Sequence, residues 1–157
     1  MVHVLAPQPS DRVYLPVFLN IDGAVGESAP NANPQDIAFV QYILRTIGNR
    51  PRGTAIAVGE VLRQVHPTGA MDPQPIAAIR ALQSTRAPGV ARDGKVSSAR
   101  GYTYDGVHTF MIVELNDAMR NRYPDLYPRL DRVPDCPPHV ATAIRDAVIG
   151  TNPAGQG

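Results

Sequence analysis

The four histidines are the first residues of this chain whose type could bind a metal ion. A spacing such as H-x-x-x-H places two imidazoles on one face of a helix, which is why zinc sites so often use it. The histidines here are His3, His66, His108 and His139, and no two of them stand at such a spacing. The sequence therefore predicts no metal site and no cofactor.

The acids and nucleophiles of the chain form no catalytic pattern either. Glycoside hydrolysis needs two carboxylates at a defined separation, and the sequence assigns no partner to Glu114. No serine stands in a G-x-S-x-G motif, and no basic residue can be assigned to Cys136, the only cysteine. No glycine-rich phosphate loop opens a helix within a β-α-β unit. We therefore predict that the protein is not an enzyme.

The charge of the chain argues against nucleic acid and anionic membranes as partners. The net charge is +1, and like charges do not occur in blocks. No apolar run approaches the ~20 residues of a membrane span, and the N-terminus lacks the features of a Sec signal peptide. We expect a protein made in the cytoplasm, which would be exported or incorporated into a particle by a non-Sec route.

A sequence motif recurs three times, each time as a polar turn followed by a short helix. The turns lie at 22–26, 68–72 and 93–96, and they contain Asp-Gly, Thr-Gly and Asp-Gly. One such unit cannot bury its own apolar stripe, so the three units must pack against each other. Each helix carries an aliphatic residue followed by an amide, in the pairs Val40-Gln41, Leu82-Gln83 and Leu115-Asn116.

Caps and breakers predict where the helices begin and end. Asn33 before Pro34 and Asp72 before Pro73 are typical of helix starts. Gly48 predicts a left-handed helix end, and Asp105 predicts the start of the longest helix. The expected helices lie, caps and breakers included, at 34–48, 54–67, 72–83, 105–124 and 138–150. An extended arm at 1–12 and a short β-rich segment at 13–21 precede them.

These elements predict a mainly α fold. A three-helix core is extended by a short helix, a small β element near the N-terminus and a C-terminal helix. We divide the chain into an N-terminal arm and strand at 1–19, a helical domain at 20–123, and a proline-rich strap with the C-terminal helix and tail at 124–157. The side chains of Ile43, Ile79 and Leu115 are predicted to meet inside the core.

The order of these turns and helices resembles the peptidoglycan-binding-like domain, a small three-helix module attached to many bacterial cell-wall hydrolases. The resemblance covers residues 20–120 and looks closest to a variant with a leading Val-Gly turn, here Val25-Gly26, found beside secretion-system and phage-tail components. It implies a non-catalytic module that recognises the bacterial cell wall. The residues that carry it lie at 33–36, 68–83 and 93–96, together with Gln41, Leu44, Phe110, Leu115 and Asn116.

Four polar residues beside the turns are the candidate ligand contacts, namely Gln41, Gln83, Asp93 and Asn116. In that hypothesis they bond peptidoglycan in a shallow groove. The alternative is that the three amides bond turn carbonyls of the neighbouring unit and set the packing register.

Aromatic and basic residues before and after the third repeat helix are candidates for a protein interface, because interfaces favour Tyr and Arg. Alternatively, the tyrosines cap the edge of the core while the arginines face solvent. The candidates are Tyr102, Tyr104, Arg120, Tyr123 and Tyr127. They keep a second function open, that of a structural or adaptor protein in a phage-like contractile or secretion assembly. The partner is then peptidoglycan or another protein.

Overall fold

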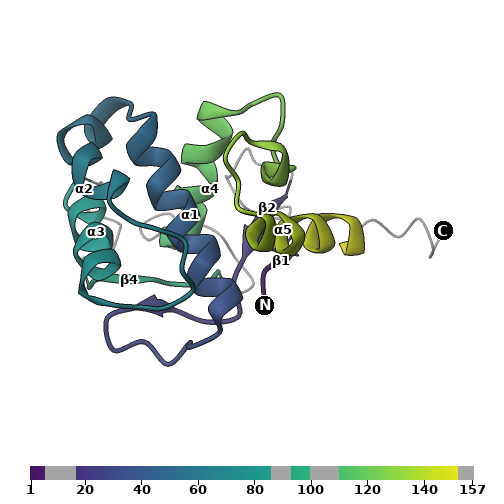
Figure 1. The fold of residues 1–157 in the computed structure, drawn as a ribbon, viewed down its shortest axis with the longest axis horizontal. Coiled ribbons are helices and arrows are strands. Elements are labelled where there is room, and N and C mark those ends of the chain that lie inside the picture. The colour runs from purple at the N-terminus through teal and green to yellow at the C-terminus, as the bar shows by residue number, and fades with distance from the viewer. Residues whose placement is uncertain (6–16, 86–92, 100–109, 152–157) are drawn as a thin grey trace.

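The computed structural model describes residues 1–5, 17–85, 93–99 and 110–151, and every structural statement concerns these residues (Figure 1). Its α-helices are α1 (Pro34–Asn49), α2 (Gly59–Arg63), α3 (Pro73–Gln83), α4 (Met111–Arg122) and α5 (Pro138–Thr151). Two 3-10 segments lie at Gly53–Val58 (η1) and Leu130–Arg132 (η2). The prediction of a mainly helical fold is therefore confirmed.

The β structure consists of two small antiparallel pairs. Strand β1 (His3–Leu5) pairs with β2 (Phe18–Asn20), and β3 (Val25–Gly26) pairs with β4 (Lys95–Val96). The small β element expected near the N-terminus is thus present. Part of the predicted arm forms its strand β1, which pairs with β2 in the predicted β-rich segment. The β3–β4 pair joins the first polar turn to the third, which brings two repeats of the sequence side by side.

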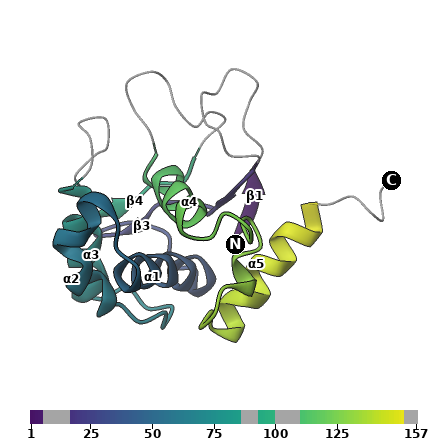
Figure 2. The same cartoon turned by 90° about the horizontal axis from the view of Figure 1, so that it is seen from above.

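Helix α1 lies at the centre of the fold and contacts each of the other four α-helices (Figure 2). Its predicted start is confirmed, because Asn33 Oδ1 accepts a hydrogen bond from the backbone N–H of Gln35 at 2.8 Å. Phe39 and Tyr42, which fall off its main apolar stripe, are also buried. Because partners surround it, α1 is buried on nearly every face.

Gly48 has a different role from the predicted helix cap. It lies inside α1, which continues to Asn49. A Cβ atom on Gly48 would lie 2.5 Å from the backbone nitrogen of Arg63 and 2.7 Å from the Cβ of Leu62. Both residues belong to α2, so the glycine is needed for the close approach of two helices rather than for a left-handed turn.

Other helix boundaries agree with the sequence in part. Asp72 caps α3 as predicted, since its side chain accepts from the N–H of Gln74 at 3.1 Å. The helix expected at 54–67 is instead the 3-10 segment η1, which contains Thr54, followed by the short α2. Helix α4 begins at Met111, after Phe110, and is shorter than α1. Asp105, its predicted cap, lies outside the described residues.

One hydrophobic cluster runs through the described part of the molecule. Ile43, Ile79 and Leu115 are fully buried members of it, which confirms that they share one core. Burying a side chain of this size contributes roughly 1.5–3 kcal/mol. The strap and α5 add five further buried residues to the same cluster: Leu130, Val133, Val140, Ala143 and Ile144.

The strap at 124–137 connects α4 to α5 and lies against α1. The hydroxyl of Tyr42 on α1 donates to the carbonyl of Leu130 at 3.2 Å. His139, at the start of α5, bonds the carbonyl of Pro67 through Nε2 at 3.0 Å. The strap and the start of α5 therefore connect the centre of the fold with the α2–α3 connection. Within the described ranges, none of the helices is long and apolar enough to cross a membrane.

Candidate binding groove

The first two amides of the repeat each hold the polar turn that follows in the chain. Gln41 Oε1 accepts from the N–H of Gly69, and its Nε2 donates to the carbonyl of Ala70, both at 2.8 Å. Gln83 makes the same pair of bonds with Gly94, at 2.9 Å, and Lys95, at 2.8 Å. Gly69 and Gly94 have φ angles of +83° and +74°, a conformation that glycine adopts without steric strain.

The third amide makes an equivalent pair of bonds with strand β2. Asn116 Oδ1 accepts from the N–H of Leu19, and its Nδ2 donates to the carbonyl of the same residue, both at 2.8 Å. Its Nδ2 also donates to the carbonyl of Ile112 at 2.8 Å. The hydroxyl of Tyr127 donates to Asn116 Oδ1 at 2.7 Å and lies 2.8 Å from the carbonyl of Val17.

The three amides therefore link the units in a ring. The first unit holds the second, the second holds the third, and the third holds the strand that precedes the first. All three side chains are buried, and these bonds are the kind that the packing-register alternative requires. A ligand could reach the amides only by displacing bonds within the protein. Asp93 is exposed, but its Oδ1 accepts from the N–H of Lys95 at 3.0 Å, which stabilises the turn.

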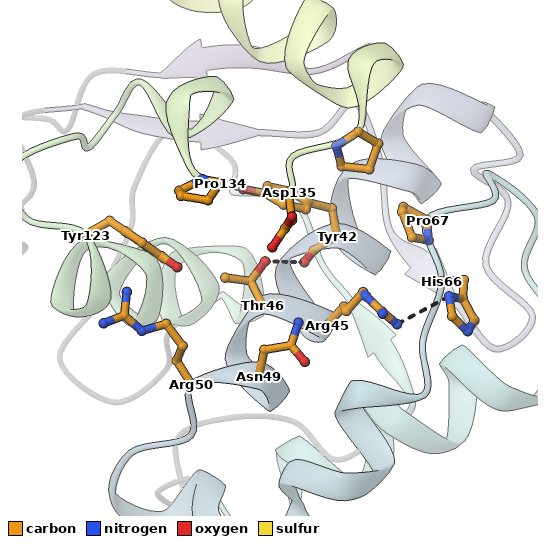
Figure 3. A pocket seen from close by; sticks show the side chains of 11 residues that line it. Tyr42, Arg45, Thr46, Asn49, Arg50, His66, Pro67, Tyr123, Pro134 and Asp135 are labelled. Atoms are coloured by element: carbon orange, nitrogen blue, oxygen red, sulfur yellow. Dashed lines mark hydrogen bonds between the residues drawn. The ribbon is translucent and has the colours of Figure 1, made fainter.

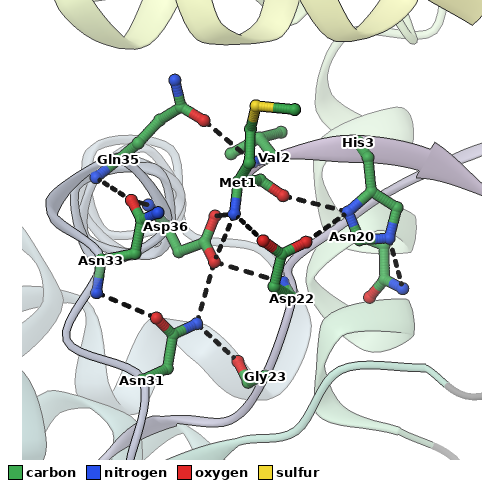
Figure 4. A network of polar contacts seen from close by, with 10 residues as sticks. All are labelled: Met1, Val2, His3, Asn20, Asp22, Gly23, Asn31, Asn33, Gln35 and Asp36. Carbon is green, nitrogen blue, oxygen red and sulfur yellow. Dashed lines mark hydrogen bonds and ion pairs between the residues drawn. The ribbon is translucent and has the colours of Figure 1, made fainter.

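The first polar turn is held by a carboxylate (Figure 4). Asp36, on the first turn of α1, is fully buried. Its Oδ2 accepts from the N–H of Asp22 at 3.2 Å and from Nδ2 of Asn31 at 2.9 Å. The amine of Met1 lies 3.0 Å from Asp36 Oδ1 and also pairs with Asp22. These contacts tie the first polar turn to the start of α1, so the cluster orders the turn.

The predicted interface residues lie in different surroundings. Tyr127 is half-buried and its hydroxyl is bonded inside the protein, so it caps the edge of the core. Burial raises the pKa of this phenol well above its usual value of 10. Arg120 is half-exposed on α4, and its charge acts on Tyr127. Tyr102 and Tyr104 lie outside the described residues. Of the three described candidates, Tyr123 alone lines the groove described next.

A groove of about 260 Å³ lies between the C-terminal half of α1 and the strap (Figure 3). Helix α1 forms its floor, because Tyr42, Thr46 and Asn49 stand on one helical face with Arg45. The segment 66–67 forms one end, and strap residues 134–137 form the rim. The groove therefore exists only because the strap crosses α1.

Arg45 is held firmly at the end of the groove nearest to His66. Its Nη1 donates to the carbonyl of Arg63 at 2.8 Å and lies 3.2 Å from Nδ1 of His66. Since a guanidinium can only donate, this bond needs an imidazole whose Nδ1 carries no proton. Arg45 has no carboxylate partner among the described residues, so its positive charge is ordered but not neutralised.

Arg50 and Tyr123 form the opposite end. The guanidinium carbon of Arg50 lies 4.9 Å from the centre of the Tyr123 ring, within the range of a cation–π contact. No ion pair neutralises Arg50 in the part of the chain that the structure describes. Both ends of the groove therefore carry a cation, and one of them also offers an aromatic ring.

Among the described residues that line the groove, Asp135 is the one carboxylate. Its backbone has a φ of +69°, a left-handed conformation that aspartate tolerates better than most residues. In Figure 3 its side chain points from the strap towards Thr46 on the floor. No ion pair to Asp135 is present among the described residues. Opposite charges thus face one groove without neutralising each other.

Two ionisable groups next to the groove, Tyr42 and Cys136, are held in their protonated form by burial. Burial raises the pKa of Tyr42 well above its usual value of 10, and it raises that of Cys136 to about 11. Both groups are therefore protonated near pH 7. The described residues contain no group of three side chains that could hold a metal ion. What the groove offers is a set of ionic, aromatic and amide contacts suited to binding.

Sequence reasoning missed most of this groove. The spacing of Tyr42, Arg45 and Asn49 on one face of the first helix was visible, but the path of the strap over that face was not. Comparisons of the chain with protein-family models, curated proteins and solved structures find no match. The fold and the groove are therefore the basis for any assignment of function.

Proposed function

We propose that this protein is a non-catalytic binding module of the peptidoglycan-binding-like type, which recognises the bacterial cell wall. The observation that carries the proposal is the ring of three amides. The three amides are among the residues on which the family resemblance rests, and each accepts a hydrogen bond from a backbone N–H of a neighbouring segment, as expected of a repeated module. The proposal includes a three-helix core of that family, formed by α1, α3 and α4.

The groove under the strap is the proposed ligand site. Peptidoglycan offers sugar rings, peptide amides and carboxylates, and the groove has a matching contact for each. The Tyr123 ring can stack on a sugar, Asn49 can bond an amide, and Arg45 can pair with a carboxylate. In this proposal the ligand contacts are side chains that face a solvent-accessible groove. They are not the amides of the repeat, which are bonded internally.

Sedimentation with purified sacculi tests this function. The wild-type protein should sediment with sacculi, and Arg50→Ala should weaken binding about tenfold by removing one charged contact. Arg145→Ala is the matched control, because it removes the same charge from an exposed site on α5 outside the groove. A wild-type protein that stays in the supernatant would overturn the proposal.

A second candidate, an adaptor that binds another protein, is favoured by exposed apolar residues on η1 and α2. Ile56 is 65% exposed and Val61 is 41% exposed, although both have large aliphatic side chains. They belong to the linker at 48–68, which contains an extra helix that the minimal module lacks. An adaptor should form a stable complex with the purified product of a neighbouring gene in gel filtration, and Ile56→Ser should abolish that complex. Sedimentation with sacculi would be unaffected by this substitution.

A further inference from the structure

We propose that the groove recognises a small zwitterion, namely the ammonium and carboxylate ends of a dipeptide-sized molecule. The inference rests on the proposed function, because it takes the same groove as the ligand site, and it adds the chemical class of the ligand. It starts from the charges of the lining. Arg45 and Asp135 face one groove from α1 and from the strap, and neither has an ion-pair partner among the described residues.

Arg45 provides the carboxylate end of the site. Its bonds to the carbonyls of Arg63 and Val65 and to His66 all use Nη1. The guanidinium is therefore fixed in orientation before any ligand arrives, while its other nitrogens remain available to a carboxylate. An arginine held in this way loses little side-chain entropy on binding.

Asp135 provides the ammonium end. The strap presents this residue from a left-handed backbone conformation, with its carboxylate directed over Thr46. A purely anionic ligand would be repelled by Asp135, and a purely cationic ligand would be repelled by the two arginines. A molecule that carries both charges satisfies both sides, so the groove discriminates by charge pattern rather than by net charge.

The size of the groove limits the length of this ligand. A volume of about 260 Å³ corresponds to roughly eight or nine waters at ~30 Å³ each. That space accommodates a dipeptide or a diamino-acid side chain, but not a folded partner. In the stem peptides of peptidoglycan, this pair of charges can come only from a diamino-acid side chain and a free carboxylate, because the N-terminus of the stem is amide-bonded to the glycan.

Titration with three forms of one dipeptide tests the inference. The probes are D-alanyl-D-alanine, its N-acetyl derivative and its C-terminal amide, measured by calorimetry on the full chain. The free dipeptide should bind about tenfold more tightly than either blocked form, because each block removes one charged contact. Equal affinity for all three forms, or no binding of the free dipeptide at millimolar concentration, would overturn the inference.

Two variants assign the charges to residues. Asp135→Asn keeps a side chain that tolerates a left-handed φ, and it should lower affinity for the free dipeptide about tenfold while leaving the N-acetyl form unchanged. Arg45→Gln should lower affinity for the free and N-acetyl forms alike, with the melting curve measured alongside because Arg45 also bonds the end of α2. An unchanged preference for the free dipeptide in Asp135→Asn would contradict the assignment.

The two proposals fail separately. Retention on sacculi that Arg50→Ala weakens, without any preference for the zwitterion, would keep the wall-binding function and remove this inference. Zwitterion binding by a protein that does not sediment with sacculi would remove the wall-binding function and keep the zwitterion site.

Discussion

Asn116 and Leu19 are 97 positions apart in sequence, yet the side-chain amide of one pairs with both backbone polar groups of the other at 2.8 Å. The geometry is that of one further step of a β-ladder, with a side chain in place of a strand. This contact closes the ring that the two glutamines begin. It connects strand β2 to α4, the last helix of the repeat.

Asn116→Ala should therefore destabilise the fold strongly. The substitution leaves the N–H and carbonyl of Leu19 buried without their partners, and it also removes an acceptor of the Tyr127 hydroxyl. We expect a loss of about 2–4 kcal/mol in the free energy of unfolding, measured by urea denaturation. Asn121→Ala, at an exposed position of the same helix, should change it by less than about 0.5 kcal/mol. Equal midpoints for the two variants would contradict the structural role of Asn116.

Gly48→Ala should cost stability even though alanine is the better helix former. The added methyl group would lie 2.5 Å from the Arg63 nitrogen, so α1 and α2 would have to separate. We expect a loss of about 1–3 kcal/mol in a denaturant titration. Gly150→Ala is the matched control within a helix, because nothing lies within 4 Å of its added Cβ. That variant should be neutral or slightly stabilised, and a stabilised Gly48→Ala would mean that the two helices are not closely packed.

Asp131 should make stability depend on pH in the acid range. Its carboxylate accepts two hydrogen bonds from Arg129, at 2.9 and 2.8 Å, and this pairing lowers its pKa. A lowered pKa in the folded state means that the contribution is present above the unfolded pKa, near 4. It is lost as the pH falls through the folded pKa. Asp131→Asn should therefore cost about 1 kcal/mol at pH 7 and progressively less below pH 4. A deficit that is independent of pH between 7 and 3 would contradict this account.

Cys136 should react slowly with thiol reagents. Burial raises its pKa to about 11, so only a small fraction is thiolate at pH 8. We expect alkylation by iodoacetamide to be at least about tenfold slower than that of glutathione at pH 8, and to accelerate as the pH approaches 11. The same measurement in urea provides the control, because the unfolded thiol should react at the ordinary rate. Fast labelling of the native protein would show that the thiol is neither buried nor raised in pKa.

The sequence was most informative where a residue acts within its own segment. Asn33 and Asp72 bond their own helix starts, so local pattern was enough to place α1 and α3. The role predicted for Gly48 was wrong, because the atoms that require a glycine there belong to another helix. Nothing in the sequence next to Gly48 distinguishes a helix cap from a close packing contact. The same holds for Arg45 and Asp135, which share one groove only through the path of the strap.

The repeated amides lie between these two cases. Their recurrence after an aliphatic residue was visible, and the packing-register alternative describes the bonds that Gln41 and Gln83 make with the turns. The partner of Asn116 could not be inferred in the same way, because it is a strand before the first turn rather than another turn. A pattern reveals equivalent positions, but it does not say which segment closes a ring.

That closure also decides how the protein can be shortened. A fragment that begins at residue 20 would omit Leu19 and leave the amide of Asn116 facing an empty position in the interior. Fusions, truncations and excised modules should therefore keep the first strand pair, even when the binding groove is the only part of interest. The natural place to attach a tag is the C-terminal end, beyond α5, because α5 makes none of the amide bonds of the ring.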